Sequence, residues 1–339
     1  MKLSPISKTL TRMIPGFAAL SVFVLATILT AGAQSPPPMP SEDLRAYQKA
    51  HSVIDWSPKE IRARKDLEDL QPAENPQDLP HILQAVGKNV GAFFEKFPNA
   101  TATESIRWEV DNGSTRSSST EDFRVFWIRG PAVGGENLEE YRSDLQGHAI
   151  NYADLSGAPL LTSRFALALL YFDPHNQGAC RYRYFGRQKL DEHETDVVGF
   201  AQIPEGDLRL ANFADNRRTD PLQFQGLAWI DQSTQEIVRI ETELLAPPPR
   251  SSLRKEITHI DFAPVHLPDI TVAAVLPSKA VVDVWLNVDE LLNFKGRIGT
   301  GTHREVAEGP SQYLQHSRNT HTFSDFKLYQ MASSSGTNP

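Results

Sequence analysis

The chain has 339 residues and a formal net charge of −8, because 42 Asp and Glu residues outnumber 34 Lys and Arg residues. Phosphate groups repel an acidic chain, which disfavours a nucleic-acid or anionic-membrane binder. Its one cysteine, Cys180, excludes any disulfide within the chain.

The first 33 residues have the order of a secretion signal. Basic residues precede an apolar run over 16–29, and the small residues 31–33 form a signal-peptidase site. Cleavage there would make Gln34 the first residue of the mature chain. We therefore predict a periplasmic or secreted protein, with an uncleaved membrane anchor as the alternative. An exported chain without disulfides is typical of bacteria.

Two short regions follow the signal. Residues 34–42 contain four prolines and are predicted to be an extended spacer. Residues 43–75 are predicted to be a helical segment, in which Ser57 and Glu60 have the spacing of a capping box. At the other end of the chain, residues 331–339 are predicted to be a disordered tail.

The clearest helix is predicted over 76–97. Its apolar residues recur at steps of three and four and form one stripe, while polar residues face away. We expect the stripe to pack on a sheet. The stripe consists of Leu79, Ile82, Leu83, Val86, Val90, Phe93, Phe94 and Phe97.

From Ser105 onward the hydrophobic period changes to two, which predicts strands. Apolar and polar residues alternate, as in an antiparallel sheet with one buried and one solvated face. The predicted strands are 105–111, 123–127, 139–142, 149–152, 181–185, 196–203, 223–231, 236–245, 253–262, 270–276, 280–287 and 320–329.

Two segments interrupt this series. Residues 160–172 are almost continuously apolar, and we interpret them as a second helix, with a buried strand as the alternative. The helix would be suited to act as a lid. Residues 288–312 are polar and contain three glycines, which favours a long loop between two strands.

The best predicted hairpin joins the strands 224–231 and 236–245. It has a glycine, then tryptophan-x-aspartate, a turn, and isoleucine-x-arginine-x-glutamate. These residues are Gly226, Trp229, Asp231, Ile237, Arg239 and Glu241.

This hairpin resembles that of the periplasmic lipoprotein-carrier superfamily of LolA- and LolB-like proteins, over roughly residues 76–330. The resemblance implies an α+β fold: a curved antiparallel sheet forming an incomplete barrel with helices on its concave face. It also implies an apolar cavity that accepts acyl chains. With the runs 184–188 and 276–278, the whole chain is further similar to a group of secreted acidobacterial proteins, from which no function follows.

The candidate ligand-binding residues are aromatic or apolar side chains of the predicted strands and lid. Aromatic walls with few polar groups suit an acyl chain. The alternative is that these residues fill a closed core. The candidates are Trp108, Phe123, Trp127 and Trp229 from strands, with Phe165 and Leu169 from the lid.

No pattern of a metal site or a catalytic centre stands out. His193 lies in an acidic stretch that we interpret as a polar turn between strands and not as a metal site. His303, His316 and His321 are near one another in sequence, but the odd spacing of the last two places them on opposite strand faces. Cys180 is expected to face the core. We therefore expect no metal, cofactor or catalytic residue.

The leading hypothesis is an exported, non-catalytic protein that binds an apolar small molecule, a lipid-like ligand or a lipidated partner in an apolar cavity. No nucleic-acid partner is expected, while transient membrane or envelope contact is compatible with this role. The first alternative is a cell-envelope structural or interaction module whose barrel is filled. The second is a secreted hydrolase of unrecognised type.

Overall fold

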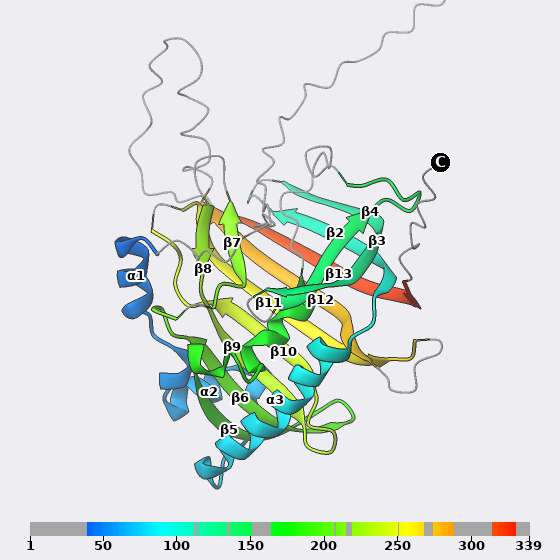
Figure 1. Ribbon diagram of the computed structural model, residues 1–339. Coiled ribbons are helices and arrows are strands. Elements are labelled where there is room, and N and C mark those ends of the chain that lie inside the picture. Colours follow the sequence, from blue (N-terminus) through cyan, green and yellow to red (C-terminus); the bar gives the residue numbers. More distant parts are fainter. Residues whose placement is uncertain are drawn as a thin grey trace, which may run out of the picture.

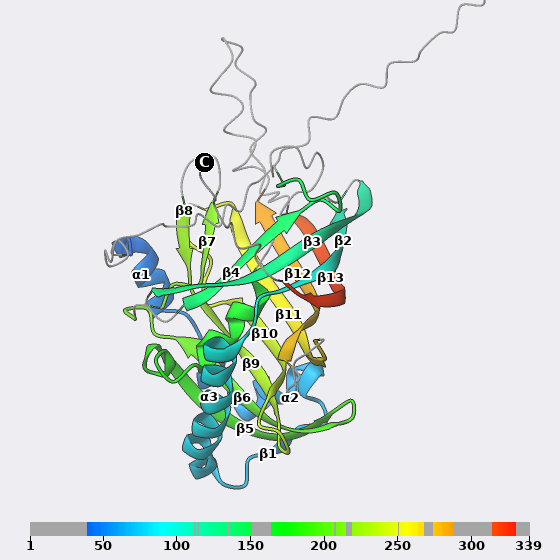
Figure 2. The ribbon, with the colours of Figure 1, turned by 45° about the vertical axis from the view of Figure 1, so that its right-hand side comes forward.

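The computed structural model describes residues 39–111, 113, 115–133, 136–150, 164–206, 208–214, 219–249, 251–267, 274–287 and 314–329. Eleven strands within these ranges form one antiparallel sheet, in the order β1-β5-β6-β9-β10-β11-β12-β13-β2-β3-β4. The sheet curls strongly without closing, so that β3 and β4 are steeply inclined to β10 and β11 (Figures 1 and 2). The predicted α+β fold with an incomplete barrel is confirmed.

The elements have the following bounds. The large sheet contains β1 (Gln71–Pro72), β2 (Ala100–Asp111), β3 (Arg116–Val133), β4 (Glu136–Ser143), β5 (Cys180–Leu190), β6 (His193–Gln202), β9 (Phe224–Asp231), β10 (Ile237–Leu244), β11 (Leu253–Val265), β12 (Ala274–Asn287) and β13 (Leu314–Leu328). A small second sheet pairs β7 (Ala211–Ala214) with β8 (Thr219–Leu222). The helices are α1 (Ser41–Gln48), η1 (Val53–Asp55), α2 (Pro58–Ala63), η2 (Lys65–Leu67), η3 (Pro76–Asp78), α3 (Leu79–Lys96), η5 (Phe165–Phe172) and η6 (Gln177–Ala179).

Helix α3 lies on the concave face, as its apolar stripe predicts. There it meets η5 and side chains from both halves of the sheet. We call this apolar cluster the main core. It includes Ile82, Val86, Val90 and Phe94 of α3, Phe165 and Leu169 of η5, and Val125, Trp127, Val198, Ile230, Ile240, Ile260 and Val282 of the sheet.

Several predicted boundaries differ from the structure. The described part of the strand predicted at 270–276 and the strand predicted at 280–287 are one strand, β12, which continues through Pro277 because a β-bulge lies at that point. Of the strand predicted at 149–152, the described residues 149 and 150 show a bridge between Ser143 and Ala149. Predictions for residues 1–33, most of 34–42, 151–152, 160–163, 270–273, 288–312 and 331–339 fall outside the described residues.

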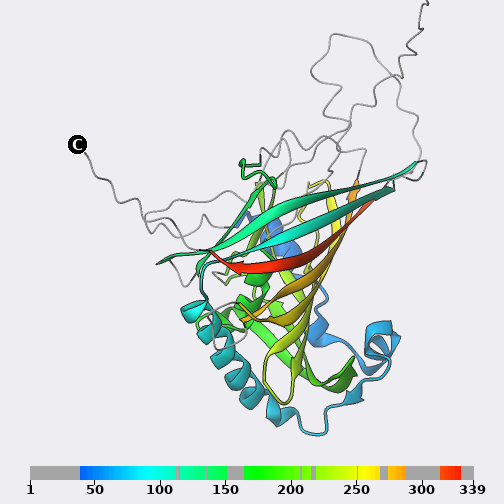
Figure 3. The same cartoon turned by 90° about the vertical axis from the view of Figure 1, so that its right-hand side faces the viewer.

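The segment from α1 to β1 lies on the opposite, convex face of the sheet (Figure 3). Apolar side chains of this segment cover a second apolar cluster there, which we call the convex cluster. Trp56, Ile61 and Leu70 pack at its edge. Its buried members are Leu67, Phe185, Val197, Leu227 and Trp229.

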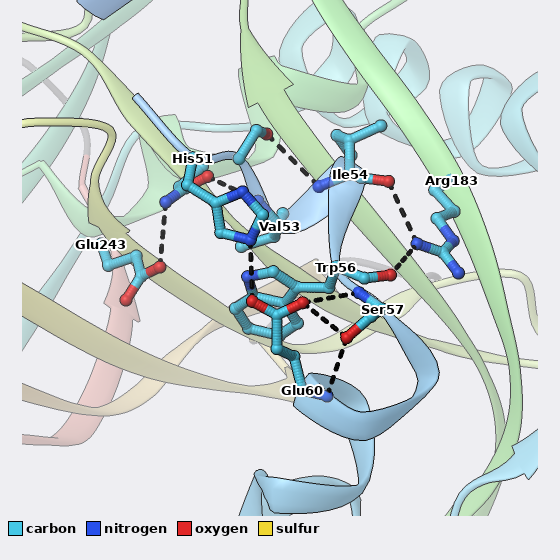
Figure 4. A network of polar contacts seen from close by, with 10 residues as sticks. His51, Val53, Ile54, Trp56, Ser57, Glu60, Arg183 and Glu243 are labelled. Carbon is cyan, nitrogen blue, oxygen red and sulfur yellow. Dashed lines mark hydrogen bonds and ion pairs between the residues drawn. The ribbon is translucent and has the colours of Figure 1, made fainter. Parts of the chain in front are cut away.

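Polar contacts fasten this segment to the sheet (Figure 4). Arg183 Nη1 donates to the carbonyl oxygens of Ile54 and Trp56, at 3.1 and 2.6 Å. The backbone N of Val53 donates to Gln225 Oε1 at 2.8 Å, and Gln225 Nε2 in turn donates to Glu243 Oε1 at 3.0 Å. The convex face of β5, β9 and β10 is therefore occupied by the chain itself.

The predicted capping box also forms. Ser57 N lies 2.7 Å from Glu60 Oε2, and Glu60 N lies 3.3 Å from Ser57 Oγ. These reciprocal bonds satisfy two backbone donors at the start of α2.

Four positions of the hairpin pattern have an architectural cause. A Cβ on Gly226 would lie 1.8 Å from the carbonyl oxygen of Glu241, so only glycine fits. Trp229 Nε1 donates to Gln188 Oε1 at 3.0 Å. Asp231 accepts the backbone N–H groups of the turn, while Arg239 donates to Asp261 at 2.6 Å. The pattern therefore specifies the sheet and does not itself line a ligand site.

Candidate functional site

The six predicted ligand-binding residues do not form one wall. Trp127, Phe165 and Leu169 belong to the main core on the concave face. Trp108 and Phe123 form a separate small cluster with Ile106, which we call the β2–β3 cluster. The rings of Trp108 and Phe123 meet edge to face, with centroids 6.1 Å apart.

Trp229 was placed on the wrong face by the sequence prediction. It lies in the convex cluster, opposite Val197 in the register of β6 and β9, and is covered by the N-terminal segment. Every residue of β9 is buried, because helices or chain segments cover both of its faces. Alternation along such a strand separates two faces but does not say which one is concave.

Four ionisable side chains are buried on the concave face beside Trp127. We call Glu104, Glu140, Arg142 and His321 the charge cluster. Arg142 donates to both carboxylate oxygens of Glu104, with Nη2 at 2.7 Å from Oε1. Nη2 also lies 3.1 Å from Glu140 Oε1, and His321 Nδ1 lies 2.8 Å from Glu104 Oε1. Each of the four side chains is at most 5% exposed.

The protonation states in this cluster follow from burial and charge. Burial opposes ionisation of Glu104, but the charge and hydrogen bonds of Arg142 and His321 lower its pKa to about 2. Burial lowers the pKa of His321, and Glu104 only partly offsets this effect. Among the described residues, His321 Nε2 has no hydrogen-bond partner. The ring is therefore neutral near pH 7.

The charge cluster holds the start of η5. The backbone N of Arg164 donates to Glu140 Oε1 at 3.0 Å, and Trp127 Nε1 donates to Oε2 of the same carboxylate at 3.1 Å. The ring of Phe165 lies edge-on to His321, with centroids 4.8 Å apart. Arg164 itself has a φ of 67°, a left-handed conformation that L-residues with a Cβ disfavour. The chain thus enters η5 through a turn that the cluster supports.

Helix η5 crosses the concave face as eight consecutive apolar residues, seven of them buried. The predicted helix over 160–172 is confirmed for 165–172, although as a 3₁₀ helix. Runs of 3₁₀ helix beyond three or four residues are uncommon, because their hydrogen bonds are poorly aligned. At the far end of η5, Tyr171 stacks on Phe200 with ring centroids 4.6 Å apart.

The charge cluster was not predicted from the sequence, although the sequence of β2 contains a signal for it. Glu104 shares the strand phase of Ala102, Ile106 and Trp108, which are all buried. An acid in the apolar phase of a strand indicates a buried charge with a partner. The predicted strand began at Ser105, one residue too late to include it.

The described histidines that the sequence singled out make contacts that stabilise the sheet and its turns. His193 lies at the β5–β6 turn with Nδ1 2.6 Å from Asp231 Oδ2, beside a small pocket of about 250 Å³. His316 and His321 face opposite sides of β13, as their spacing predicts. His316 contacts Asp283 and stacks on Trp285 on the convex face. His303 lies outside the described residues.

Cys180 is buried, and burial raises the pKa of its thiol to about 12, so it is not a reactive thiolate. Within the part of the chain that the structure describes, no group of three or more His, Cys, Asp or Glu side chains is placed to hold a metal ion. In the same ranges, no helix has the length and hydrophobicity to cross a membrane.

Comparison with known proteins yields matches among solved structures only. No protein-family model matches the chain, and no curated protein matches its sequence. A putative outer membrane lipoprotein-sorting protein domain from Vibrio parahaemolyticus is 12% identical, with 74% of this chain and 94% of that chain covered and a TM-score of 0.36. A DUF1329 family protein from Desulfovibrio piger is 9% identical, with 73% of this chain and 94% of that chain covered and a TM-score of 0.36.

A LolA superfamily protein from Nitrosomonas europaea is 11% identical, with 76% of this chain and 97% of that chain covered and a TM-score of 0.28. The similarity concerns the fold alone.

Proposed function

We propose that the protein is exported to the periplasm and binds an apolar, lipid-like ligand, or the acyl chain of a lipidated partner, without catalysis. The ligand would occupy the concave face in place of part of η5. Trp127, Phe165 and Leu169 would contact it first, while Trp108 and Phe123 would extend the surface along β2 and β3.

The observation that carries this proposal is η5 itself. It places a run of aliphatic and aromatic side chains along the concave face in a helix type that is weak at this length. Three polar anchors hold its ends. The Arg164 N–H donates to Glu140 at one end; at the other, the Tyr182 hydroxyl donates to the carbonyl oxygen of Tyr171, and Gln177 Nε2 donates to that of Phe172. Such a segment is suited to be exchanged for another apolar chain.

The energies of such an exchange are comparable. Burying a Leu or Phe side chain contributes about 1.5–3 kcal/mol, so displacing four or five of them costs about 6–15 kcal/mol. An acyl chain of about 14 methylenes contributes about 11 kcal/mol on leaving water, at about 0.8 kcal/mol per methylene. A long acyl chain can therefore offset the release of η5, whereas a short one cannot.

A filled interaction module is the second candidate, and near-complete burial of the main core favours it. Trp127 is 1% exposed, and Phe165 and Leu169 are 3% and 4% exposed. In that case η5 would be a permanent part of the core. It would cover the concave face as the N-terminal segment covers the convex face.

Native mass spectrometry of the full chain, purified from its host, separates the two candidates. A carrier is expected to retain a lipid-sized mass that organic solvent removes and that added long-chain fatty acid restores. A single unliganded mass, unchanged by fatty acids of 12 to 18 carbons, would favour the filled module.

A further inference from the structure

His321 lies on the concave face between two apolar clusters. In the antiparallel register of β13, it is opposite Ala280 of β12 on one side and Ile106 of β2 on the other. Residues directly opposite each other in such a pair point to the same face of the sheet. Ala280 belongs to the main core and Ile106 to the β2–β3 cluster. The imidazole of His321 therefore lies at the junction that a ligand in contact with both clusters would cross.

The imidazole is fully buried, and η5 contributes to its cover. The His321 side chain is 0% exposed. The ring of Phe165, the first residue of η5, lies edge-on to it with centroids 4.8 Å apart. Phe165 is also one of the residues in the part of η5 that the ligand would replace. A ligand in that position would therefore lie directly beside the imidazole.

Hydrogen bonding fixes the state of the two ring nitrogens. Nδ1 of His321 lies 2.8 Å from Glu104 Oε1, and an ionised carboxylate can only accept a hydrogen bond, so Nδ1 carries the ring proton. In the neutral ring, Nε2 then has a lone pair and no proton. Among the described residues, no group donates a hydrogen bond to Nε2. It is a buried acceptor without a donor.

The carboxylates of the charge cluster have donors already. Arg142 donates to both oxygens of Glu104. Glu140 Oε1 accepts from Arg142 and from the backbone N of Arg164. Glu140 Oε2 accepts from Trp127 Nε1. These oxygens require no cation from a ligand, and an anion would meet two carboxylates that share one guanidinium. The requirement that is left is an uncharged donor for the imidazole.

A buried acceptor without a donor is costly in a closed core, because it has lost its hydrogen bonds to water. In a ligand site the same atom has a use, since a few polar groups in an apolar pocket fix the orientation of the ligand. The position of His321 between the two apolar clusters suits this use. An alkyl chain on the main core would bring a polar end group next to the imidazole.

We propose that His321 Nε2 accepts a hydrogen bond from the hydroxyl group of an uncharged long-chain amphiphile whose alkyl chain lies along the main core. This inference rests on the proposed function and narrows its ligand class. The hydroxyl group would lie in the place beside the imidazole that Phe165 occupies. An ether has no proton to donate to Nε2, and a carboxylate would add a negative charge beside Glu104 and Glu140.

Two probes with the same alkyl chain test this proposal: tetradecanol and its methyl ether, each displacing a fluorescent apolar dye from the full mature chain. The measurement is made at pH 8, where a histidine ring is neutral. The ether is the more hydrophobic probe, so a purely apolar wall would bind it more tightly. We expect the reverse order, with tetradecanol binding about fivefold more tightly, because only the alcohol donates to the buried acceptor.

Two matched variants assign this preference to one nitrogen atom. His321→Phe removes the acceptor and keeps a ring beside Phe165, so it should abolish the preference for tetradecanol. His316→Phe is the control, because His316 lies on the convex face of the same strand, where its ring stacks on Trp285. This control should keep the preference. The readout is the ratio of the two affinities, since a merely structural change at position 321 would weaken both probes together.

The outcomes separate this inference from the proposed function. If the unsubstituted protein binds the ether as tightly as tetradecanol, or more tightly, the role of His321 is overturned and the carrier function stands. That comparison needs no variant, so it decides the question even where His321→Phe does not fold. A folded His321→Phe variant that keeps the preference would overturn the role of His321 as well. If neither probe displaces the dye, the carrier function itself fails.

Discussion

His321 Nδ1 lies 2.8 Å from Glu104 Oε1, although 217 residues separate the two in the chain. The contact joins β13, the last strand of the chain, to its neighbour in the sheet, the early strand β2. Arg142 of β4 pairs with Glu104 and with Glu140. Glu140 in turn accepts a hydrogen bond from the backbone N of Arg164, at the start of η5. One buried group of charges therefore connects three strands and helix η5.

Removing one partner of the charge cluster should destabilise the protein strongly. Glu104→Gln leaves the Arg142 guanidinium buried without its main counter-charge, and such losses cost about 3–5 kcal/mol. Urea unfolding followed by circular dichroism measures the change. Arg107→Gln is the control, because its pair with Glu109 is exposed on the same strand and is worth less than about 1 kcal/mol. Similar small losses in both variants would show that the cluster is not formed.

The cluster also predicts that acid destabilises the fold. The pKa values of Glu104 and His321 are both lowered in the folded state, so the folded chain binds fewer protons than the unfolded chain. The stability these groups provide should fall as the pH drops below about 6.5, the ordinary value for histidine, and continue to fall toward pH 2. His321→Gln should flatten the upper part of this decline, in unfolding curves recorded from pH 7.5 to 4.

The stability contribution of Glu256, in β11, changes with pH in the opposite direction, so this residue serves as the control for that experiment. Its pKa is raised to about 7, so the stability it provides is present below about pH 4.5 and is lost as the pH rises through 7. Glu256→Gln should therefore gain roughly 2–3 kcal/mol relative to the unsubstituted protein between pH 4.5 and pH 8. A gain that does not vary with pH would mean that the carboxyl is solvated.

The stripe of α3 should show graded sensitivity to truncation. Phe94 is 4% exposed in the main core, so Phe94→Ala is expected to cost about 3–5 kcal/mol. Phe93 is only partly buried, at the edge of the main core, and Phe93→Ala should cost less. Lys88→Ala, on the exposed side of the helix, should cost under about 0.5 kcal/mol. Equal effects at all three positions would show that α3 is not docked.

Export is predicted from residues 1–33 alone. A fusion of residues 1–40 to a reporter should cross the inner membrane, and the mature protein should begin at Gln34. N-terminal sequencing of the exported protein is the measurement. Recovery of Met1 on that protein would establish an uncleaved anchor instead.

Much of the fold was predictable because its patterns are local. The apolar stripe of α3 and the alternation in the central strands need no distant partner to be recognised. Boundaries were less predictable where a bulge or a proline interrupts the pattern, as at Pro277 in β12. The 3₁₀ geometry of η5 could not be predicted from the sequence either, because a continuous apolar run is compatible with any buried helix or strand.

The candidate site was only partly predictable, for a different reason. Trp127, Phe165 and Leu169 share the main core, whereas Trp229 lies in the convex cluster, because a strand buried on both sides has no solvent-exposed face to mark its orientation. The charge cluster depends on strands that are far apart in sequence. Glu104 could be flagged by its strand phase, whereas its partner His321 is fixed only by sheet order.

The most direct test of the central claim follows η5 while a ligand binds. Ala168 is the one residue of η5 that is partly exposed, and Cys180 is buried, so Ala168→Cys can be labelled selectively with an environment-sensitive dye. Lys88→Cys, on the exposed side of α3, provides the matched control label. The account predicts that a saturating long-chain ligand shifts the emission at position 168 and leaves that at position 88 unchanged. Unchanged emission at position 168 while native mass spectrometry detects a bound ligand would contradict the replacement of η5, and the absence of any bound ligand would contradict a carrier and leave a filled barrel.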